Sequence, residues 1–367
     1  MRASLVLTLL MPIVAVCPAS AAVPISNTTR TADGVNALSP LPFVDATHQP
    51  ADQPIRDARR PIRLHTTTEH AVTLSWDRTA LRERWLARTP FVIEQLPLVG
   101  GRTVDLELRP FAVTGPNTKF VVGRKGEPDA VLDFDPASVL LFRGKVMGRP
   151  GSHVFLALSD SRSTGYVDLG RGEGRFRVSS RGADGEPLPP GSISMYEPFG
   201  PATAPPGVPL CGVTDTGGTR HSEGGVAGET DFSIKHLELA VETDFEFYVL
   251  FRDLDDAAAY LVAMYGAVSD VYLRDVHTHV ELVFARLWDT PDDLFNDVDP
   301  SPLPEFRQYW NANMGAVHRD LAQLLSGRRD YLFGGQAYLT SLCGGNAYSV
   351  VGYAAGFFPD PTMIVWK

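Results

Sequence analysis

The sequence predicts an α+β protein in which an antiparallel β region is followed by an α/β region. Between about residues 91 and 198, short segments of alternating apolar and polar residues follow one another, separated by Gly, Pro, Ser and Asp. After residue 231, strand-like segments alternate with two long segments of helical spacing. The 367 residues are enough for two domains.

The N-terminus has the pattern of a secretory signal peptide, which we assign to residues 1–22. Arg2 precedes an apolar run from Leu5 to Val16, and Ala19-Ser20-Ala21 fits the small-residue rule for cleavage. Residues 23–75 are rich in Pro, Thr, Asp and Ala without periodicity, and we expect a mobile leader there. The pattern predicts a secreted, extracellular protein, and no later segment predicts a membrane span.

The charge of the chain argues against one class of partner. The formal net charge is −10, and Lys and Arg form no block along the sequence. Nucleic acid binding needs a basic face, so we expect no nucleic acid partner.

The β-rich segment spans residues 76–198 and opens with a short helix. Residues 77–88 place Leu81, Trp85 and Leu86 on one face, and Asp77 is suited to cap the N-terminus. The segment "TVDLELRPFAV" and its successors then alternate as strands do. Together they predict an antiparallel sandwich or open barrel.

A linker at residues 199–231 separates this segment from the α/β region at residues 232–367. The linker is rich in Pro and Gly, and it contains Cys211. The expected strands in the α/β region are "KHLELAVETD", "HVELVFARLW", "DYLFGGQAYLTSLC" and "AYSVVGYAAG". The expected helices are 253–276 and one long helix over 302–327 that starts near Pro304.

Cysteine and histidine provide the first candidates for chemistry. Once the signal peptide is removed, Cys211 and Cys343 remain, and an oxidising compartment favours a disulfide between them. The alternative for Cys211 is a thiolate that binds a metal ion. His277 and His279 in "HTHVE" could share a strand face, although two ligands are fewer than a metal site normally uses.

Three segments of the second region, in order, resemble one enzyme family. They are "KHLELAVETDFEFY", "VHRDLAQLLSG" and "AYLTSLCGGNAYSVVG", and they are similar to the first half of the catalytic domain of reprolysin-like (metzincin) zinc metalloproteases. "LFRGKVMGRPGSHVFLALSDSRSTGYVDLG" looks like the prodomain of that family, and "PLCGVTD" looks like its cysteine switch. The resemblance covers about residues 91–367 and implies a β prodomain followed by an incomplete zincin-like catalytic domain.

The resemblance implies a latent enzyme. By similarity, Cys211 is the inhibitory zinc ligand of the latent form, which would occupy the position that a catalytic water needs. Activation would require a cut between Cys211 and the catalytic region, where Arg220 is the only basic residue before Lys235. The disulfide between Cys211 and Cys343 stays open as the alternative.

The resemblance also implies a calcium site and a substrate-binding edge. Glu238 and Asp320 match positions that bind a structural calcium ion in venom members, with ordinary solvated carboxylates as the alternative. Leu339, Thr340 and Ser341 match an edge strand that lies along the cleft, where a substrate adds as a further strand.

The zinc site of the family is missing from these residues. None of the nine His residues belongs to an H-E-x-x-H segment. By the spacing of the family, the catalytic residues are expected beyond Lys367. We therefore expect this chain to be truncated and inactive on its own, and not to bind zinc stoichiometrically.

Two functions from different classes follow. The first is a secreted zinc metalloendopeptidase precursor of reprolysin-like type that, in its full-length form, hydrolyses peptide bonds of protein or peptide substrates. The second is a non-catalytic secreted binding protein or pseudo-enzyme remnant. Whether this chain is an enzyme stays open at the level of sequence.

Overall fold

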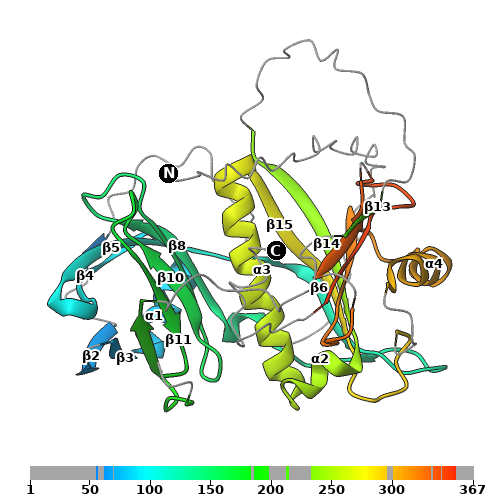
Figure 1. Ribbon diagram of the computed structural model, residues 1–367, viewed down its shortest axis with the longest axis horizontal. Helices are drawn as coiled ribbons and strands as arrows, with labels where there is room; N and C mark the ends of the chain where they lie inside the picture. The colour runs from blue at the N-terminus through cyan, green and yellow to red at the C-terminus, as the bar shows by residue number, and fades with distance from the viewer. Residues whose placement is uncertain are drawn as a thin grey trace, which may run out of the picture.

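The chain forms two β-sheets with a long helix between them (Figure 1). The computed structural model describes residues 55–56, 62–68, 70–182, 186–197, 212–214, 233–295, 301–331, 334–339 and 341–352. Strands and helices are both abundant there, and the first sheet is almost wholly antiparallel. The predicted α+β class is confirmed.

The first sheet has ten strands. In spatial order they are β1 (Ile55–Arg56), β4 (Phe91–Pro97), β5 (Thr103–Phe111), β8 (Leu140–Val146), β9 (His153–Leu158), β10 (Thr164–Asp168), β11 (Arg175–Ser179), β12 (Ser192–Tyr196), β3 (Ala71–Trp76) and β2 (Ile62–Thr67). Only the pair β1 and β4 is parallel.

Strand β2 and all of β3 except Trp76 lie inside residues 23–75, where the sequence predicted a leader without regular structure. The structure differs because "AVTLSW" alternates over a short range: Val72, Leu74 and Trp76 are buried, while Thr73 and Ser75 are only partly buried. Strand β3 pairs with β12, the last strand of the first sheet in sequence order.

Helix α1 (Arg78–Ala87) confirms the predicted helix and its cap. The side chain of Asp77 accepts a hydrogen bond from the Ala80 amide at 3.0 Å, as an N-cap does. Leu81 and Trp85 are buried, and Trp85 Nε1 donates to the carbonyl of Phe111 at 2.9 Å. Leu86 was wrongly placed on the same face, because it is 46% exposed.

The second sheet has eight strands. In spatial order they are β13 (Gly212–Thr214), β17 (Gly335–Tyr338), β18 (Tyr348–Val351), β16 (Leu321–Leu325), β14 (Lys235–Thr243), β15 (Thr278–Leu287), β6 (Thr114–Val122) and β7 (Ala130–Val131). The pairs β17–β18 and β6–β7 are antiparallel, and all the other pairs are parallel. The sheet is therefore mixed, and both of its margins come from segments before residue 232.

The long helix predicted over 302–327 is wrong in its second half. Helix α4 spans Leu303–Asn313 only, and Leu321–Leu325 form strand β16 in the middle of the second sheet. The run "LAQLL" has helix-forming residues, but it is too short for its periodicity to decide between helix and strand. Burial between β14 and β18 decides for the strand.

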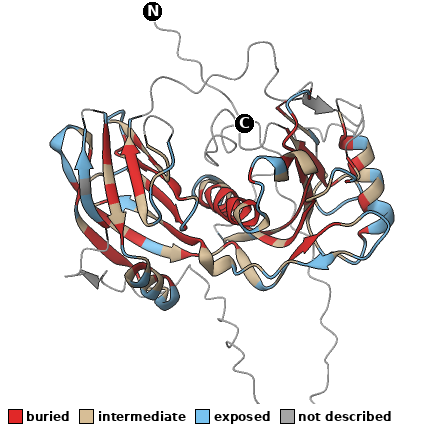
Figure 2. Ribbon diagram, turned by 90° about the horizontal axis from the view of Figure 1, so that it is seen from below, coloured by how far each residue is buried: buried red, intermediate tan, exposed pale blue. Residues whose placement is uncertain are grey.

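Helices α2 (Phe245–Val249) and α3 (Leu254–Val276) follow β14, and α3 lies between the two sheets (Figures 1 and 2). Asp253 caps α3 by accepting from the Asp256 amide at 2.8 Å, and His277 ends it in the left-handed conformation. The small residues Ala257, Ala258 and Ala259 let the helix pack closely. In the part of the chain that the structure describes, no helix combines the length and hydropathy of a membrane span.

Candidate functional site

Strand β17 is the outermost strand that the α/β region contributes to the second sheet, and a segment of the predicted linker pairs with it. Strand β17 pairs antiparallel with β18 on one side. On its other side it pairs in parallel with β13, in the register Gly212 with Gln336, Val213 with Ala337 and Thr214 with Tyr338. Three residues directly after Cys211 therefore form the outermost strand of the sheet.

The predicted substrate-binding residues lie just past this strand. Strand β17 ends at Tyr338, whereas the sequence placed the edge strand at Leu339, Thr340 and Ser341. Leu339 is 40% exposed, and the Ser341 hydroxyl donates to the carbonyl of Tyr338 at 2.9 Å, which closes a turn. Thr340 lies outside the described residues. The predicted strand was placed too late in the sequence because polar and apolar residues alternate as well in "GQAY" as in "AYLTS", so the pattern does not decide between them.

Cys343 lies in the loop between β17 and β18. It has a left-handed backbone with φ of 59°, and its amide donates to the carbonyl of Asp320 at 3.1 Å. It forms a disulfide, and its partner lies outside the described residues because the other two cysteines, Cys17 and Cys211, both do. A disulfide at Cys343 is compatible with the predicted pairing of Cys343 with Cys211, which itself lies outside the described residues. The predicted zinc-ligand role of Cys211 stays a prediction.

The structure brings together the two predicted calcium ligands. The Glu238 amide donates to Oδ2 of Asp320 at 2.9 Å, and the Asp320 amide donates to the carbonyl of Glu238 at 2.9 Å. Oε2 of Glu238 lies 2.5 Å from Nδ1 of His318. The Asp320 side chain and the backbone groups of Glu238 and Asp320 therefore join β14 to the residue before β16, and the role in calcium binding stays a prediction.

The described residues do not fit a zinc ion. Among the described residues, no group of three or more His, Cys, Asp and Glu side chains could hold a metal ion, and the sequence has no H-E-x-x-H segment. The two histidines of the predicted pair have different positions in the fold. His277 ends α3, whereas Nδ1 of His279 lies 3.1 Å from the Ser269 hydroxyl. We derive no chemical step through a metal.

His279 gives the fold an acid sensitivity that can be measured. Its burial, together with His236 and Arg143, lowers its pKa to about 4. The unfolded chain takes up this proton near pH 6.5 and the folded chain does not, so the contribution of His279 to stability falls by about 3 kcal/mol as the pH drops from 6.5 to 4. In urea titrations from pH 7 to 4, we therefore expect the stability of His279→Gln relative to wild type to rise by about 3 kcal/mol. His318→Gln, whose histidine side chain is 90% exposed, is the surface control.

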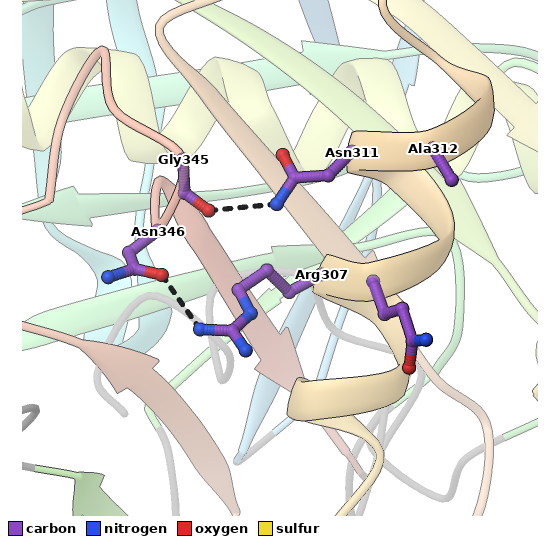
Figure 3. Close-up of a pocket in the computed structure, with 6 residues that line it drawn as sticks. Arg307, Asn311, Ala312, Gly345 and Asn346 are labelled. Carbon is purple, nitrogen blue, oxygen red and sulfur yellow. Dashed lines mark hydrogen bonds between the residues drawn. The ribbon is translucent and has the colours of Figure 1, made fainter.

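A groove beside the end of β17 was not predicted. It encloses about 550 Å³ and is lined by Arg307, Gln308, Asn311 and Ala312 of α4 and by Gly345 and Asn346 (Figure 3). Arg307 Nη1 donates to Asn346 Oδ1 at 2.8 Å, and Asn311 Nδ2 donates to the carbonyl of Gly345 at 3.0 Å. The Arg307 guanidinium lies 5.1 Å from the ring centroid of Tyr338. The groove therefore offers one cation and several amides next to the last residue of the strand.

No local sequence signal marks this groove. Arg307 belongs to a helix whose spacing indicates only its buried face, and Asn346 belongs to a turn that comes after Cys343. Their proximity depends on the pairing of β18 with β16, which places the turn over α4. A contact of that kind is set by the sheet and cannot be read from either segment alone.

Two solved structures show weak likeness to the fold of this chain. Sequence-family models and curated proteins give no match. The crystal structure of metalloproteinase-II from Bacteroides fragilis is similar with a TM-score of 0.36 and 11% identity, over 72% of this chain and 76% of that chain. A chaperone–substrate complex is similar with a TM-score of 0.28 and 6% identity, over 57% of this chain and 29% of that chain. Likenesses of this strength assign neither a family nor an activity.

Proposed function

We propose that this chain is part of a secreted metalloendopeptidase precursor of reprolysin-like type, in which the margin of β17 receives an extended polypeptide. The observation that carries the proposal is the pairing of Gly212–Thr214 with Gln336–Tyr338. In the proposed latent form, this segment of the chain's own linker occupies the position of a substrate strand. The peptidase part of the proposal rests on the sequence resemblance.

The chemistry of a sheet margin supports the binding role. A strand with unpaired backbone groups on one side captures another extended strand through main-chain hydrogen bonds, and neighbouring pockets then select its side chains. Beside β17, the groove of Arg307 and Asn346 could take a polar or acidic side chain of the bound strand. A protein or peptide is therefore the class of partner that this site fits.

A non-catalytic binding protein is the second candidate, and one observation favours it. The nine His residues include no H-E-x-x-H segment, which is the zinc motif that the peptidase candidate needs. The two candidates share the binding step and differ in what happens to the bound peptide afterwards.

The test removes β13 from the margin of β17 and then adds the same segment as a separate peptide. Val213→Pro removes a backbone donor and disfavours a regular strand, so β13 should leave β17. We expect amide exchange at Gln336–Tyr338 to rise roughly ten-fold, as the loss of about 1–2 kcal/mol of pairing implies. A labelled peptide of residues 208–217 with Cys211→Ser should then bind the variant and not the wild-type chain. Reducing buffer is used because Cys343 forms a disulfide.

Val213→Ala is the matched control, since it keeps the backbone donor and should leave both exchange and peptide binding unchanged. If exchange rises in Val213→Pro and the peptide still does not bind, the margin does not receive strands and the proposed function fails. Because the catalytic residues of the precursor are expected beyond Lys367, this chain should leave the peptide intact under both candidates. Sequencing the gene past the Lys367 codon separates them: an H-E-x-x-H segment there supports the peptidase precursor, and its absence supports the binding protein.

A further inference from the structure

The chain crosses from the first sheet to the second within a few residues. Strand β5 ends at Phe111 in the first sheet, and β6 begins at Thr114 in the second sheet (Figure 1). Strand β6 then pairs in parallel with β15, with Lys119 opposite Phe284 and Val122 opposite Leu287. A strand from the predicted prodomain segment is thus built into the α/β sheet.

Side-chain and backbone hydrogen bonds fix β6 in this position. The Thr118 hydroxyl donates to the carbonyl of Leu282 at 2.6 Å, and the Leu282 amide donates to the carbonyl of Val113 at 2.7 Å. The Gly123 amide donates to the carbonyl of Leu287 at 2.7 Å. Any side chain at Gly123 would collide with the Trp288 ring, since a Cβ there would lie 2.5 Å from a ring atom.

Both faces of β6 are covered by elements of the second half. Phe120 belongs to the apolar cluster around α3, and Val121 belongs to the cluster on the opposite face, which contains Trp310. The short strand β7 covers the outer margin of β6 over two residues only. Without β6, strand β15 would become an open margin with exposed apolar side chains.

Helix α3 joins the two sheets in a second way. Leu141, Phe155 and Tyr166 of the first sheet lie in the same apolar cluster as the buried face of α3. The Cα of Gly266 comes so close to Leu141 that a Cβ would lie 2.9 Å from that side chain.

The contact between α3 and the first sheet also contains a buried polar group. Nε2 of His153 lies 2.6 Å from Oδ2 of Asp270, which is 2% exposed. Tyr166 donates a longer hydrogen bond to the same oxygen at 3.4 Å. Removal of the first sheet would expose this carboxylate and the apolar face around it.

We infer that the two halves form one inseparable folding unit, and that a cut in the 199–231 linker leaves the N-terminal half bound to the α/β half. The N-terminal half is a permanent part of the second sheet through β6. If the margin of β17 is to be freed, segment 212–214 must move while the first sheet stays in place. This inference stands on the topology and does not depend on the proposed peptidase.

In the experiment, the full chain is cut in the 199–231 linker, and dissociation of the N-terminal piece from the C-terminal piece is measured. A site-specific protease sequence replaces residues 221–228, and the cut chain is kept in reductant so that no disulfide joins the pieces. On native size-exclusion chromatography at micromolar concentration, we expect co-elution, with less than about 5% of either piece free. One thermal transition should include both pieces. Separate elution of two folded pieces would overturn the inference.

A matched pair of variants at Lys119 tests the part played by β6. The Lys119 side chain is exposed and opposite Phe284, so Lys119→Ala should leave co-elution unchanged. Lys119→Pro disrupts the strand backbone and should release or aggregate the cut pieces. A Lys119→Pro chain that fails to fold before the cut supports the same conclusion when Lys119→Ala folds normally. Co-elution of cut Lys119→Pro with an unchanged unfolding midpoint would contradict it.

Discussion

Replacing Glu242 by Ala is expected to lower the free energy of unfolding by about 3–5 kcal/mol, which is the range for breaking a buried ion pair on one side. Glu242 is fully buried on β14, and its two carboxylate oxygens accept four hydrogen bonds. Arg286 donates to both oxygens, at 2.7 and 2.8 Å. Trp288 and Trp310 donate at 2.7 and 2.9 Å.

The large loss of stability expected for Glu242→Ala follows from the buried groups that lose their partner. Burial alone would lower the pKa of Arg286, but Glu242 more than offsets this and raises it, so the guanidinium stays charged. Without Glu242, the nearest described carboxylate is that of Asp129 at 3.5 Å, and two indole N–H groups lose their acceptor. An uncompensated buried charge and two buried donors are left in the core.

Urea unfolding at pH 7 measures this loss. Glu238→Ala is the matched control, because Glu238 lies on the same strand with its side chain 37% exposed and should change stability by less than about 1 kcal/mol. Equal losses in the two variants would mean that the Glu242 cluster does not stabilise the core in the way described.

Replacing Asp244 by Asn is expected to change the pH dependence of stability. Asp244 caps α2, where Oδ1 accepts from the amides of Phe247 at 2.8 Å and Gly327 at 2.9 Å, and Ser326 donates to Oδ2. Its burial raises its pKa to about 7, against the opposing effect of these hydrogen bonds.

The sign of the effect follows from proton uptake in the two states. Between pH 4 and 7 the folded chain keeps a proton on Asp244 that the unfolded chain has released, so the contribution of Asp244 to stability falls as the pH rises through this range. Asn cannot titrate and retains an acceptor oxygen. The stability of Asp244→Asn relative to wild type should therefore rise by about 4 kcal/mol from pH 4 to pH 8.

Chemical denaturation at four or five pH values between 4 and 8 tests this. Asp253→Asn is the control, because Asp253 caps α3 in the same geometry at an exposed position. A difference between Asp244→Asn and wild type that stays constant with pH would show that burial does not hold the proton on Asp244.

The elements that could be predicted are those whose signals are local. Asp77 and the spacing of Leu81 and Trp85 define α1, and Asp253 with the apolar spacing after it defines α3. The alternation in "TVDLELRPF" likewise defines β5. In each case a single segment of the sequence contains the hydrophobic periodicity of the element, and for the two helices it also contains the residue that caps the N-terminus.

The elements that could not be predicted depend on distant partners. The run "LAQLL" forms a strand because β14 and β18 flank it, and "GVT" forms a strand because β17 is next to it. The segment "TGPNTKFVV" contains Gly, Pro and Asn, and nothing in it says which sheet it joins. The candidate site has the same origin, since β13, β17 and Arg307 come together only in the folded sheet.

The position of β6 has a consequence for the order of events during synthesis. Thr118 emerges from the ribosome 164 residues before its partner Leu282, a delay of roughly 8 to 33 s at ordinary elongation rates. Through that interval the nascent chain presents a strand whose final neighbour does not yet exist. Folding of the first half therefore cannot be completed until the second half is made, and slow translation lengthens the time in which β6 can pair with the wrong chain.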